Sequence, residues 1–447
     1  MSGDSTELSQ EGLIVPPIRF VHKGKIENDI AAMITANVRT PEISIGDLRA
    51  QMAANILGRR RLLELVEKYG LETLHDSMEE VMDYSERMTR SAIRRMPKGR
   101  CEAEDFLDDA GLGGRPIKIR VAISIGEDSI KIDFTGTDRQ VEGPLNAVWG
   151  VTIAGVYYVV KCVTDPAIPT NDGSFRPIEA HAPVGSIVNP TRPAPVAGGN
   201  VETSQRNVDV LLKAFSRIVP ERVCAACQGT MNNVSVGGID PKTGRPWSFY
   251  ETIGGGFGGR VGLDGVDAIH SHMTNTMNTP IEVIEAVYPI RFTSYKMRAD
   301  SGGPGEWRGG VGLERRWMLN APTATLSILA ERNKLPPWGL FGGAPGARGQ
   351  YYLVASNGRK RKLGSKCTVR MKGGDSLVVR TPGGGGYGDP LEREPRAVLE
   401  DVANGLVSQG SARDDYGVVI HGEILGIDSK ATAQLRKRMR SGPRLHP

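Results

Sequence analysis

The chain has few of the residues that identify nucleic-acid-binding, membrane or secreted proteins. Aromatic residues make up only 6% of the 447 residues, too few for a surface that stacks bases. No run of 18 apolar residues occurs, and no signal peptide opens the chain. The five cysteines form no disulfide framework, which indicates a reducing compartment. We therefore expect a cytoplasmic protein with no nucleic-acid and no membrane partner.

Familiar enzyme loops are also missing, although glycine is abundant, with 56 residues. The run 383–386 lies between Pro382 and Pro390, so no helix begins there, and no Lys-Ser or Lys-Thr pair follows it. The run 254–259 is not a dinucleotide-binding loop either. Both runs predict backbone packed closely on backbone, because glycine has no Cβ. The G-x-S-x-G and H-E-x-x-H motifs of hydrolases are absent as well.

Hydrophobic periodicity predicts an α+β fold with long N-terminal helices, a large glycine-rich and β-rich centre, and a short helical C-terminal segment. We expect a polar lead-in over 1–40 and a helical region over 41–112. The central α+β core is expected over 113–392, and a helix with a basic tail over 393–447. The net charge of +5 is small for this length, and the basic clusters are interpreted as solvated faces or subunit contacts.

Individual elements follow from the same periodicity. A helix is predicted from a capping box at Ser44 and Asp47 to Gly70, and a second from about Leu74 to Met96, both with apolar stripes expected in the core. Alternation over 117–134 predicts an antiparallel hairpin. Further helices are predicted over 150–162, from Thr203 or Ser204 to Pro220, and from Glu394 onward.

Polar side chains gather first at Gly198–Arg206, just before a predicted helix. Asn200, Thr203, Ser204 and Arg206 are candidate substrate-binding residues, because the free N–H groups of a helix start can hold an anion or a carbonyl. The alternative is a helix whose first turn is only capped by Asn200 and Thr203.

A second polar segment, 264–282, supplies the candidate catalytic residues Asp264, His270 and His272. On a strand the two histidines would project to the same side, where they could exchange protons or bind a divalent metal. The alternative is a polar loop whose side chains bond the backbone. No metal ligand is assigned.

Two further groups have simpler interpretations. Asp300 is expected to pair with Arg298 or Arg308 and so hold glycine turns. The close pair Cys224 and Cys227 is expected to pack in the core, because no histidine lies near it in sequence to complete a zinc site. Redox or metal use is the alternative for this pair.

Many segments in order resemble the hydantoinase B/oxoprolinase family, from Glu11-Gly-Leu13 to Val419. They are Asp133–Thr137, Asn146, Asn189-Pro190, Gly198–Arg206, Pro220–Val223, Gly229–Asn233, Gly254–Arg260, Asp264–Glu282, Asp300–Gly303, Arg308–Gly310, the run ending in Tyr387–Pro390, Asp401 and Tyr416–Val418. The resemblance implies a B-type subunit of an ATP-dependent enzyme that opens cyclic amides such as 5-oxoproline or a hydantoin. A hydantoinase A-type partner would bind ATP and Mg and phosphorylate the amide oxygen, and the B-type subunit would complete hydrolysis.

The resemblance leaves two alternatives: a subunit of an acetone- or acetophenone-type ketone carboxylase, and a non-catalytic assembly scaffold. Family members have a further N-terminal region ahead of the equivalent of Glu11, with Asp- and His-containing motifs associated with a divalent metal. No position of this chain receives those ligands. We therefore expect the chain to be inactive alone, with the missing segment either a separate N-terminal polypeptide or lost by truncation.

Overall fold

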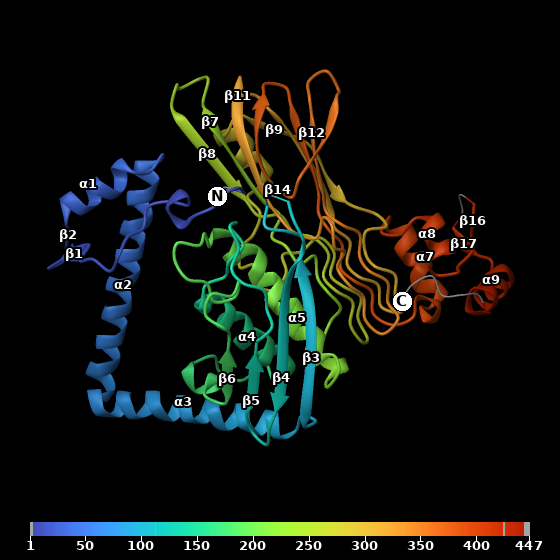
Figure 1. The fold of residues 1–447 in the computed structure, drawn as a ribbon, viewed down its shortest axis with the longest axis horizontal. Coiled ribbons are helices and arrows are strands. Elements are labelled where there is room, and N and C mark those ends of the chain that lie inside the picture. The colour runs from blue at the N-terminus through green and yellow to red at the C-terminus, as the bar shows by residue number, and fades with distance from the viewer. Residues whose placement is uncertain (1–2, 112, 423–424, 442–447) are drawn as a thin grey trace.

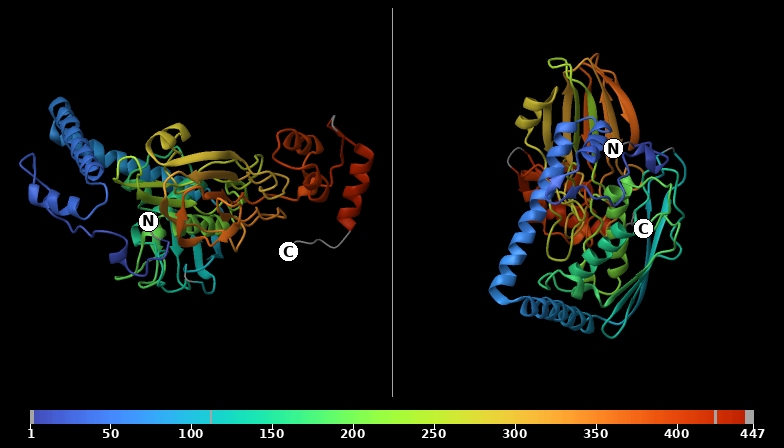
Figure 2. Two further views of the ribbon diagram at one scale, coloured as in Figure 1. Left: turned by 90° about the horizontal axis from the view of Figure 1, so that it is seen from above. Right: turned by 90° about the vertical axis from the view of Figure 1, so that its left-hand side faces the viewer.

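The computed structural model describes residues 3–111, 113–422 and 425–441. A helical N-terminal arm leads into a central body made of a helix-covered sheet and a two-sheet sandwich, and a small helical segment closes the chain (Figure 1). The left-hand view of Figure 2, seen from above, shows the arm and the C-terminal segment at opposite ends of this body. This arrangement agrees with the predicted α+β class. Among the described residues, no helix combines the length and the apolar character needed to cross a membrane.

The arm consists of a small hairpin, β1 (Val21–His22) and β2 (Lys25–Ile26), and of helices α1 (Asn28–Ala36), α2 (Pro41–Tyr69) and α3 (Leu71–Arg94). The predicted start at Ser44 is wrong, because Pro41 occupies the first turn and fits it without a hydrogen bond. The predicted burial of the α2 stripe is also wrong: none of its described residues is buried. Only the C-terminal half of α3 packs on the body, through buried residues such as Thr89 and Ile93.

The first layer of the body is the sheet β3-β4-β5-β6, formed by Gly99–Leu107, Ile117–Ile125, Ile130–Asp133 and Ile178–His181. Strands β4 and β5 form the predicted antiparallel hairpin. Helices α4 (Trp149–Val163) and α5 (Ser204–Phe215), both predicted, share one apolar core with this sheet. Strand β3 was not predicted, because its inward positions include Asp105 beside Cys101 and Ala103, which hides the apolar alternation.

The second layer is a sandwich of two antiparallel sheets. One has the order β14-β11-β7-β8 and the other β13-β12-β15-β10-β9. Their inner faces share a single apolar core, as expected for aligned sheets. The strands are β7 (Asn233–Ile239), β8 (Pro246–Glu251), β9 (Ile290–Met297), β10 (Leu313–Leu319), β11 (Thr323–Leu329), β12 (Gln350–Val354), β13 (Lys360–Leu363), β14 (Lys366–Lys372) and β15 (Ser376–Arg380), with α6 (Ile281–Val287) before β9.

Glycine loops stack between the sandwich and the C-terminal segment, where Figure 1 shows several loops running side by side. The amides and carbonyls of the run 383–386 bond to neighbouring loops, as in the bonds Gly384 N to Gly310 O (2.9 Å) and Gly385 N to Ala226 O (2.8 Å). A Cβ at Gly384 would lie 2.0 Å from the Phe257 carbonyl oxygen. This confirms the prediction of backbone packed on backbone.

The C-terminal segment holds α7 (Pro395–Ala403), α8 (Gln409–Asp414), the short hairpin β16 (Ile420–His421) and β17 (Gly426–Ile427), and α9 (Ser429–Ser441). Its small core is formed by Val398, Val407, Ala412, Tyr416 and Val418. The predicted helix from Glu394 is α7, with Pro395 in the first turn.

Candidate functional site

A polar cleft of about 270 Å³ brings the two predicted polar segments together. Asn200, the loop 273–277 and Tyr250 and Glu251 of β8 line it, together with Met231, Thr252 and Thr279. Gln205 ties the segments to each other, because its amide donates to the Ser271 carbonyl (3.2 Å) and the Thr274 hydroxyl (2.9 Å). The cleft therefore offers neutral hydrogen-bonding groups and one carboxyl to a small polar ligand.

Glu251 is the one carboxyl among the lining residues of the cleft, and it is 7% exposed. Burial raises its pKa, and this effect outweighs the opposing influence of Arg315, whose Nη1 lies 2.7 Å from Oε1. The Asn278 amide donates to the same oxygen at 3.0 Å and to the Thr252 carbonyl at 2.9 Å. A carboxyl with a raised pKa at a cleft wall can transfer protons.

His270 is linked to this group through Asn278. Because the Asn278 amide nitrogen already donates to Glu251 and Thr252, its oxygen must accept from His270 Nε2, 3.2 Å away. Nδ1 is then the unprotonated ring nitrogen. It is buried with no hydrogen-bond partner among the described residues. Burial also lowers the pKa of His270, against the hydrogen bond that its Nε2 donates to Asn278, and so favours the neutral form of the ring.

His272 lies in a different environment, and the prediction that both histidines project to one side of a strand is wrong. Their segment is a loop, and the His272 backbone has φ +41°, which ends the two-residue alternation. Its Nε2 is 3.8 Å from Asp209, and its Nδ1 is 3.3 Å from the Tyr158 hydroxyl. Burial lowers the pKa of His272, although Asp209 opposes this.

The candidates of segment 198–206 have mostly structural partners. A π-helical turn, Gly199–Thr203, leads directly into α5. The Thr203 hydroxyl donates to the Leu145 carbonyl, and the Ser204 hydroxyl donates to the Asn200 carbonyl at 2.6 Å. Both predicted alternatives are wrong for this described segment. The π-helical turn runs into α5, so the N–H groups at the start of α5 are not free, and neither Asn200 nor Thr203 caps the helix through its side chain. Asn200 alone among the four candidates lines the cleft.

Arg206 is completely buried and belongs to an ionic network. Its guanidinium lies within 4 Å of three carboxylates, and the Arg332 guanidinium bridges Asp209 (2.6 Å) and Asp105 (2.9 Å). Burial alone would raise the pKa of Asp105, but Arg332 and Arg206 lower it to about 2. The geometry thus gives Arg206 a structural environment, and its substrate-binding role stays a prediction.

Asp264 lies in another ionic group, beside the glycine loops. Arg393 donates to both of its carboxylate oxygens at 2.7 Å, and the Arg308 amide donates to one of them at 2.7 Å. The expected pairing of Asp300 is wrong. Arg308 pairs with Asp267 and Asp401 instead, and Asp300 accepts from the Ser408 amide at 2.7 Å. Asp264 therefore holds the C-terminal segment to the loops, and a catalytic role for it stays a prediction.

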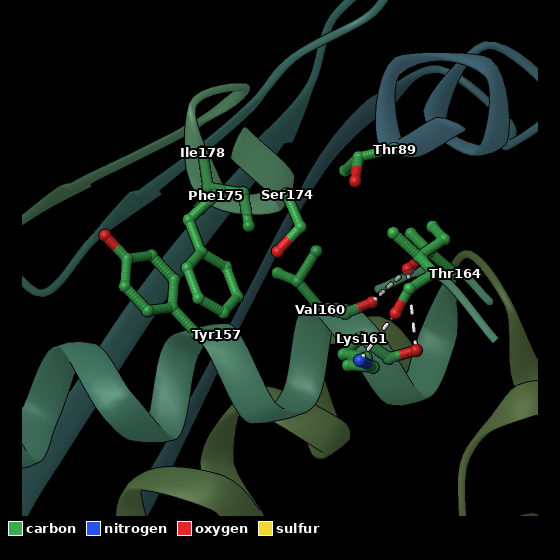
Figure 3. Close-up of a pocket in the computed structure, with 9 residues that line it drawn as sticks. Thr89, Tyr157, Val160, Lys161, Thr164, Ser174, Phe175 and Ile178 are labelled. Carbon is green, nitrogen blue, oxygen red and sulfur yellow. Dashed lines mark hydrogen bonds between the residues drawn. The ribbon is translucent and has the colours of Figure 1, made fainter. Parts of the chain in front are cut away.

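A second, much smaller space lies between α3, α4 and the turn Asp172–Phe175 (Figure 3). The Tyr157 and Phe175 rings stack there with centroids 3.9 Å apart. Its volume of about 10 Å³ holds at most one water molecule. It is a packing gap and not a ligand site.

Sequence reasoning missed Tyr250 and Glu251, although a signal existed. Trp247, Phe249 and Glu251 occupy successive inward positions of β8, so a carboxyl stands where alternation places an apolar side chain. The structure also brings His272 to Cys224 and Cys227, which is the one group of three potential metal ligands among the described residues. No spacing in the sequence links these three residues, because 45 positions separate Cys227 from His272.

The fold and the site thus define an α+β protein with a body of stacked glycine loops and a polar cleft. Comparison with protein families then places it: residues 1–390 match the model of Hydantoinase B/oxoprolinase. The chain belongs to the hydantoinase B/oxoprolinase family, and the resemblance inferred from the sequence is confirmed. The group of three potential metal ligands in the described part of the chain consists of two cysteines and one histidine, and the divalent metal implied by the resemblance stays a prediction.

Relatives extend across nearly the whole chain. An uncharacterised protein of Methanocaldococcus jannaschii is 47% identical over 98% of this chain and 76% of its own length. A putative B-type subunit of a D-/L-hydantoinase from a Pseudomonas species is 34% identical over 97% of this chain and 74% of its own. The 5-oxoprolinase 1 of Arabidopsis thaliana is 36% identical over 87% of this chain, which spans only 31% of that protein.

Solved structures have the same fold. The ATP-dependent caprolactamase of Pseudomonas jessenii superposes with a TM-score of 0.89 at 29% identity, over 97% of this chain and 76% of that one. Nucleotide-free acetone carboxylase superposes with a TM-score of 0.91 at 21% identity, over 98% of this chain and 65% of that one. At the latter identity the likeness concerns the fold alone.

Proposed function

We propose that this chain is the B-type subunit of an ATP-dependent cyclic-amide hydrolase. An A-type partner that binds ATP and Mg phosphorylates the amide oxygen of a small ring, and this chain completes the hydrolysis. The observation that carries the proposal is the family match across residues 1–390, together with relatives named as a B-type hydantoinase subunit and a 5-oxoprolinase. An unactivated lactam is a poor electrophile, whereas its O-phosphorylated form is open to attack by water.

Hydrolysis is favoured over ketone carboxylation because the chain has higher sequence identity to cyclic-amide enzymes than to acetone carboxylase. The named relatives at 34% to 36% are cyclic-amide enzymes, whereas acetone carboxylase matches at 21% and supports only a common fold. The scaffold alternative has no feature of its own in its favour. The cleft beside Asn200 and Glu251, in contrast, has the size and neutral polarity suited to a five- to seven-membered lactam.

We assign the activated ring to this cleft and proton transfer to Glu251. Water adds to the activated carbon, the carbon–nitrogen bond breaks as the ring nitrogen gains a proton, and the acyl phosphate so formed is hydrolysed by a second water to the ring-opened acid and phosphate. Glu251 lines the cleft, and burial raises its pKa, a shift in the direction that suits a carboxyl that transfers protons. His270, through Asn278, positions it and can accept a proton at Nδ1. His272 does not line the cleft, so its proposed catalytic role is weaker.

The test is reconstitution with an A-type subunit and ATP. 5-Oxoproline, hydantoin, caprolactam and, as the ketone, acetone are offered as substrates, and ring-opened product, carboxylated product and phosphate are measured together, with and without bicarbonate. Ring opening that needs both subunits and ATP supports the proposal. A bicarbonate-dependent carboxylated product from a ketone would replace it with the carboxylase, and full ring opening by the A-type subunit alone would reduce this chain to a scaffold.

Glu251→Gln separates a catalytic cleft from mere assembly. The variant is expected to bind the A-type subunit and to lose about 100-fold in ring opening. Glu179→Gln is the matched control, because Glu179 lies on the solvent-exposed side of β6 and pairs with Lys131. Unchanged turnover by Glu251→Gln would remove this residue from the site.

A further inference from the structure

Cys224, Cys227 and His272 form a buried group of soft ligands that the cleft does not use. One ligand atom from each lies within 4.8 Å of the others. Cys227 is fully buried, Cys224 is 7% exposed, and the His272 side chain is 2% exposed. Both cysteines are free thiols. Two thiols and an imidazole are the donor set that zinc prefers over calcium or magnesium.

The spacing is close to that of a bound ion. Ligands of a tetrahedral zinc at about 2.3 Å lie about 3.8 Å from one another. The largest separation here is 4.8 Å, so closing on an ion needs side-chain movements of about 1 Å at most. Three protein ligands leave the fourth position to water or to a further donor.

The surroundings also fit a metal-binding histidine. His272 Nε2 and Asp209 Oδ1 are buried and lack hydrogen-bond partners among the described residues, although they are only 3.8 Å apart. Metal-binding imidazoles usually donate the second ring N–H to a carboxylate or another oxygen. Asp209 faces Nε2 and the Tyr158 hydroxyl faces Nδ1 at 3.3 Å, so either ring nitrogen can bind an ion while the other has a partner.

The backbone holds these residues in place. The Ala225 amide donates to the Gly259 carbonyl (2.9 Å), and the Ala226 amide donates to the Trp338 carbonyl (3.0 Å). The Gly258 amide points at Cys227 Sγ, 3.4 Å away. His272 has the left-handed φ of +41°, a conformation that costs energy and persists where the surrounding structure fixes it.

We propose that Cys224, Cys227 and His272 bind one zinc ion. This site is separate from the Asp- and His-based metal expected of the family, and it does not depend on the proposed hydrolase function. Because its ligands come from the loop before β7 and from the loop that borders the cleft, the ion would tie the cleft wall to the glycine-bonded body.

The test measures zinc on the full chain. The purified, reduced protein is loaded with Zn²⁺, desalted and analysed for metal, and a parallel sample is loaded with Co²⁺ for absorption spectroscopy. We expect one equivalent of zinc and an intense thiolate-to-cobalt charge-transfer band. Cys227→Ser and His272→Ala should each weaken zinc binding by about 100-fold or more. Cys367→Ser is the matched control, since this thiol lies on β14, apart from the proposed ligands, and donates to the Gly364 carbonyl.

Two results would overturn the proposal. One is a reduced wild-type chain that retains no zinc and gives no thiolate band with Co²⁺. The other is zinc retention by Cys227→Ser and His272→Ala equal to that of Cys367→Ser. If a variant fails to fold, the cobalt spectrum of the unmodified chain decides alone. Cys162 is unsuitable as a control, because its thiol interacts with Tyr158 and Cys224.

Discussion

Substitution of Gly384 by alanine tests whether the stacked glycine loops hold the body together. The new Cβ would lie 2.0 Å from the Phe257 carbonyl oxygen and 2.3 Å from its carbon. Side-chain carbons do not approach backbone oxygens closer than 3.0 Å, so the two loops must separate by at least 1.0 Å (3.0 minus 2.0). Both neighbours are backbone, and no rotamer change can relieve the contact.

The expected cost follows from the hydrogen bonds that this separation stretches. Four bonds of 2.8–2.9 Å join this part of the run to other loops: Gly384 N to Gly310 O, Gly303 N to Gly384 O, Gly385 N to Ala226 O and Gly259 N to Gly385 O. An N–H···O bond lengthened by 1 Å is lost. At a net value of about 1 kcal/mol each, Gly384→Ala should lower the free energy of unfolding by about 4 kcal/mol.

Urea unfolding followed by circular dichroism measures this free energy. Gly150→Ala is the control: Gly150 lies in the first turn of α4, and a Cβ there meets nothing within 4 Å. This variant should change the free energy of unfolding by no more than about 1 kcal/mol, in the stabilising direction. A Gly384→Ala protein as stable as Gly150→Ala would refute the account of close backbone packing.

Three further predictions concern other parts of the chain. The folded protein holds the pKa of Asp105 at about 2, below the value of about 3.9 in an unfolded chain. The ionised carboxylate therefore stabilises the fold above pH 4, and this stabilisation is lost as Asp105 is protonated. The free energy of unfolding should fall by about 2 kcal/mol between pH 4 and pH 2. Acid titration of Asp105→Asn should lack this component. Leu62→Ala and Leu63→Ala should each lower the free energy of unfolding by less than about 0.5 kcal/mol, since α2 buries neither residue. Leu211 is fully buried in α5, so Leu211→Ala should lower it by about 2–5 kcal/mol. A large loss of stability in either α2 variant would contradict the exposure of this helix. His270→Ala should reduce the rate of ring opening by the reconstituted complex. His75→Ala, in the exposed part of α3, should leave this rate unchanged. Equal rates for the two variants would exclude His270 from the catalytic site.

Much of the fold was predictable because local patterns specify it. The alternation over 117–134 corresponds to strands that bury their apolar positions, and the predicted helical stripe lies in α5, which is buried nearly all round. The glycine runs predicted close backbone contact, because only a missing Cβ permits it. Strand β3 escaped prediction because buried Asp105 interrupts its apolar positions, and its charge is compensated by Arg332, which is distant in sequence.

The site was less predictable because its geometry depends on long-range contacts. The segments around Asn200 and His270 were identified separately, and the bonds from Gln205 to Ser271 and Thr274 that join them were not. The positive φ of His272 turns its side chain away from the environment of His270. No sequence spacing indicates a loop conformation of this kind, and the approach of His272 to Cys224 and Cys227 follows from it.

Coupling of ring opening to ATP hydrolysis tests the central claim most directly. The A-type subunit, this chain and ATP are combined with 5-oxoproline, and amino acid product and ADP are counted over the same time course. The account predicts ring-opened product in proportion to ADP only when both proteins are present, and none from either protein alone. Ring opening by this chain without the A-type subunit or ATP would contradict it.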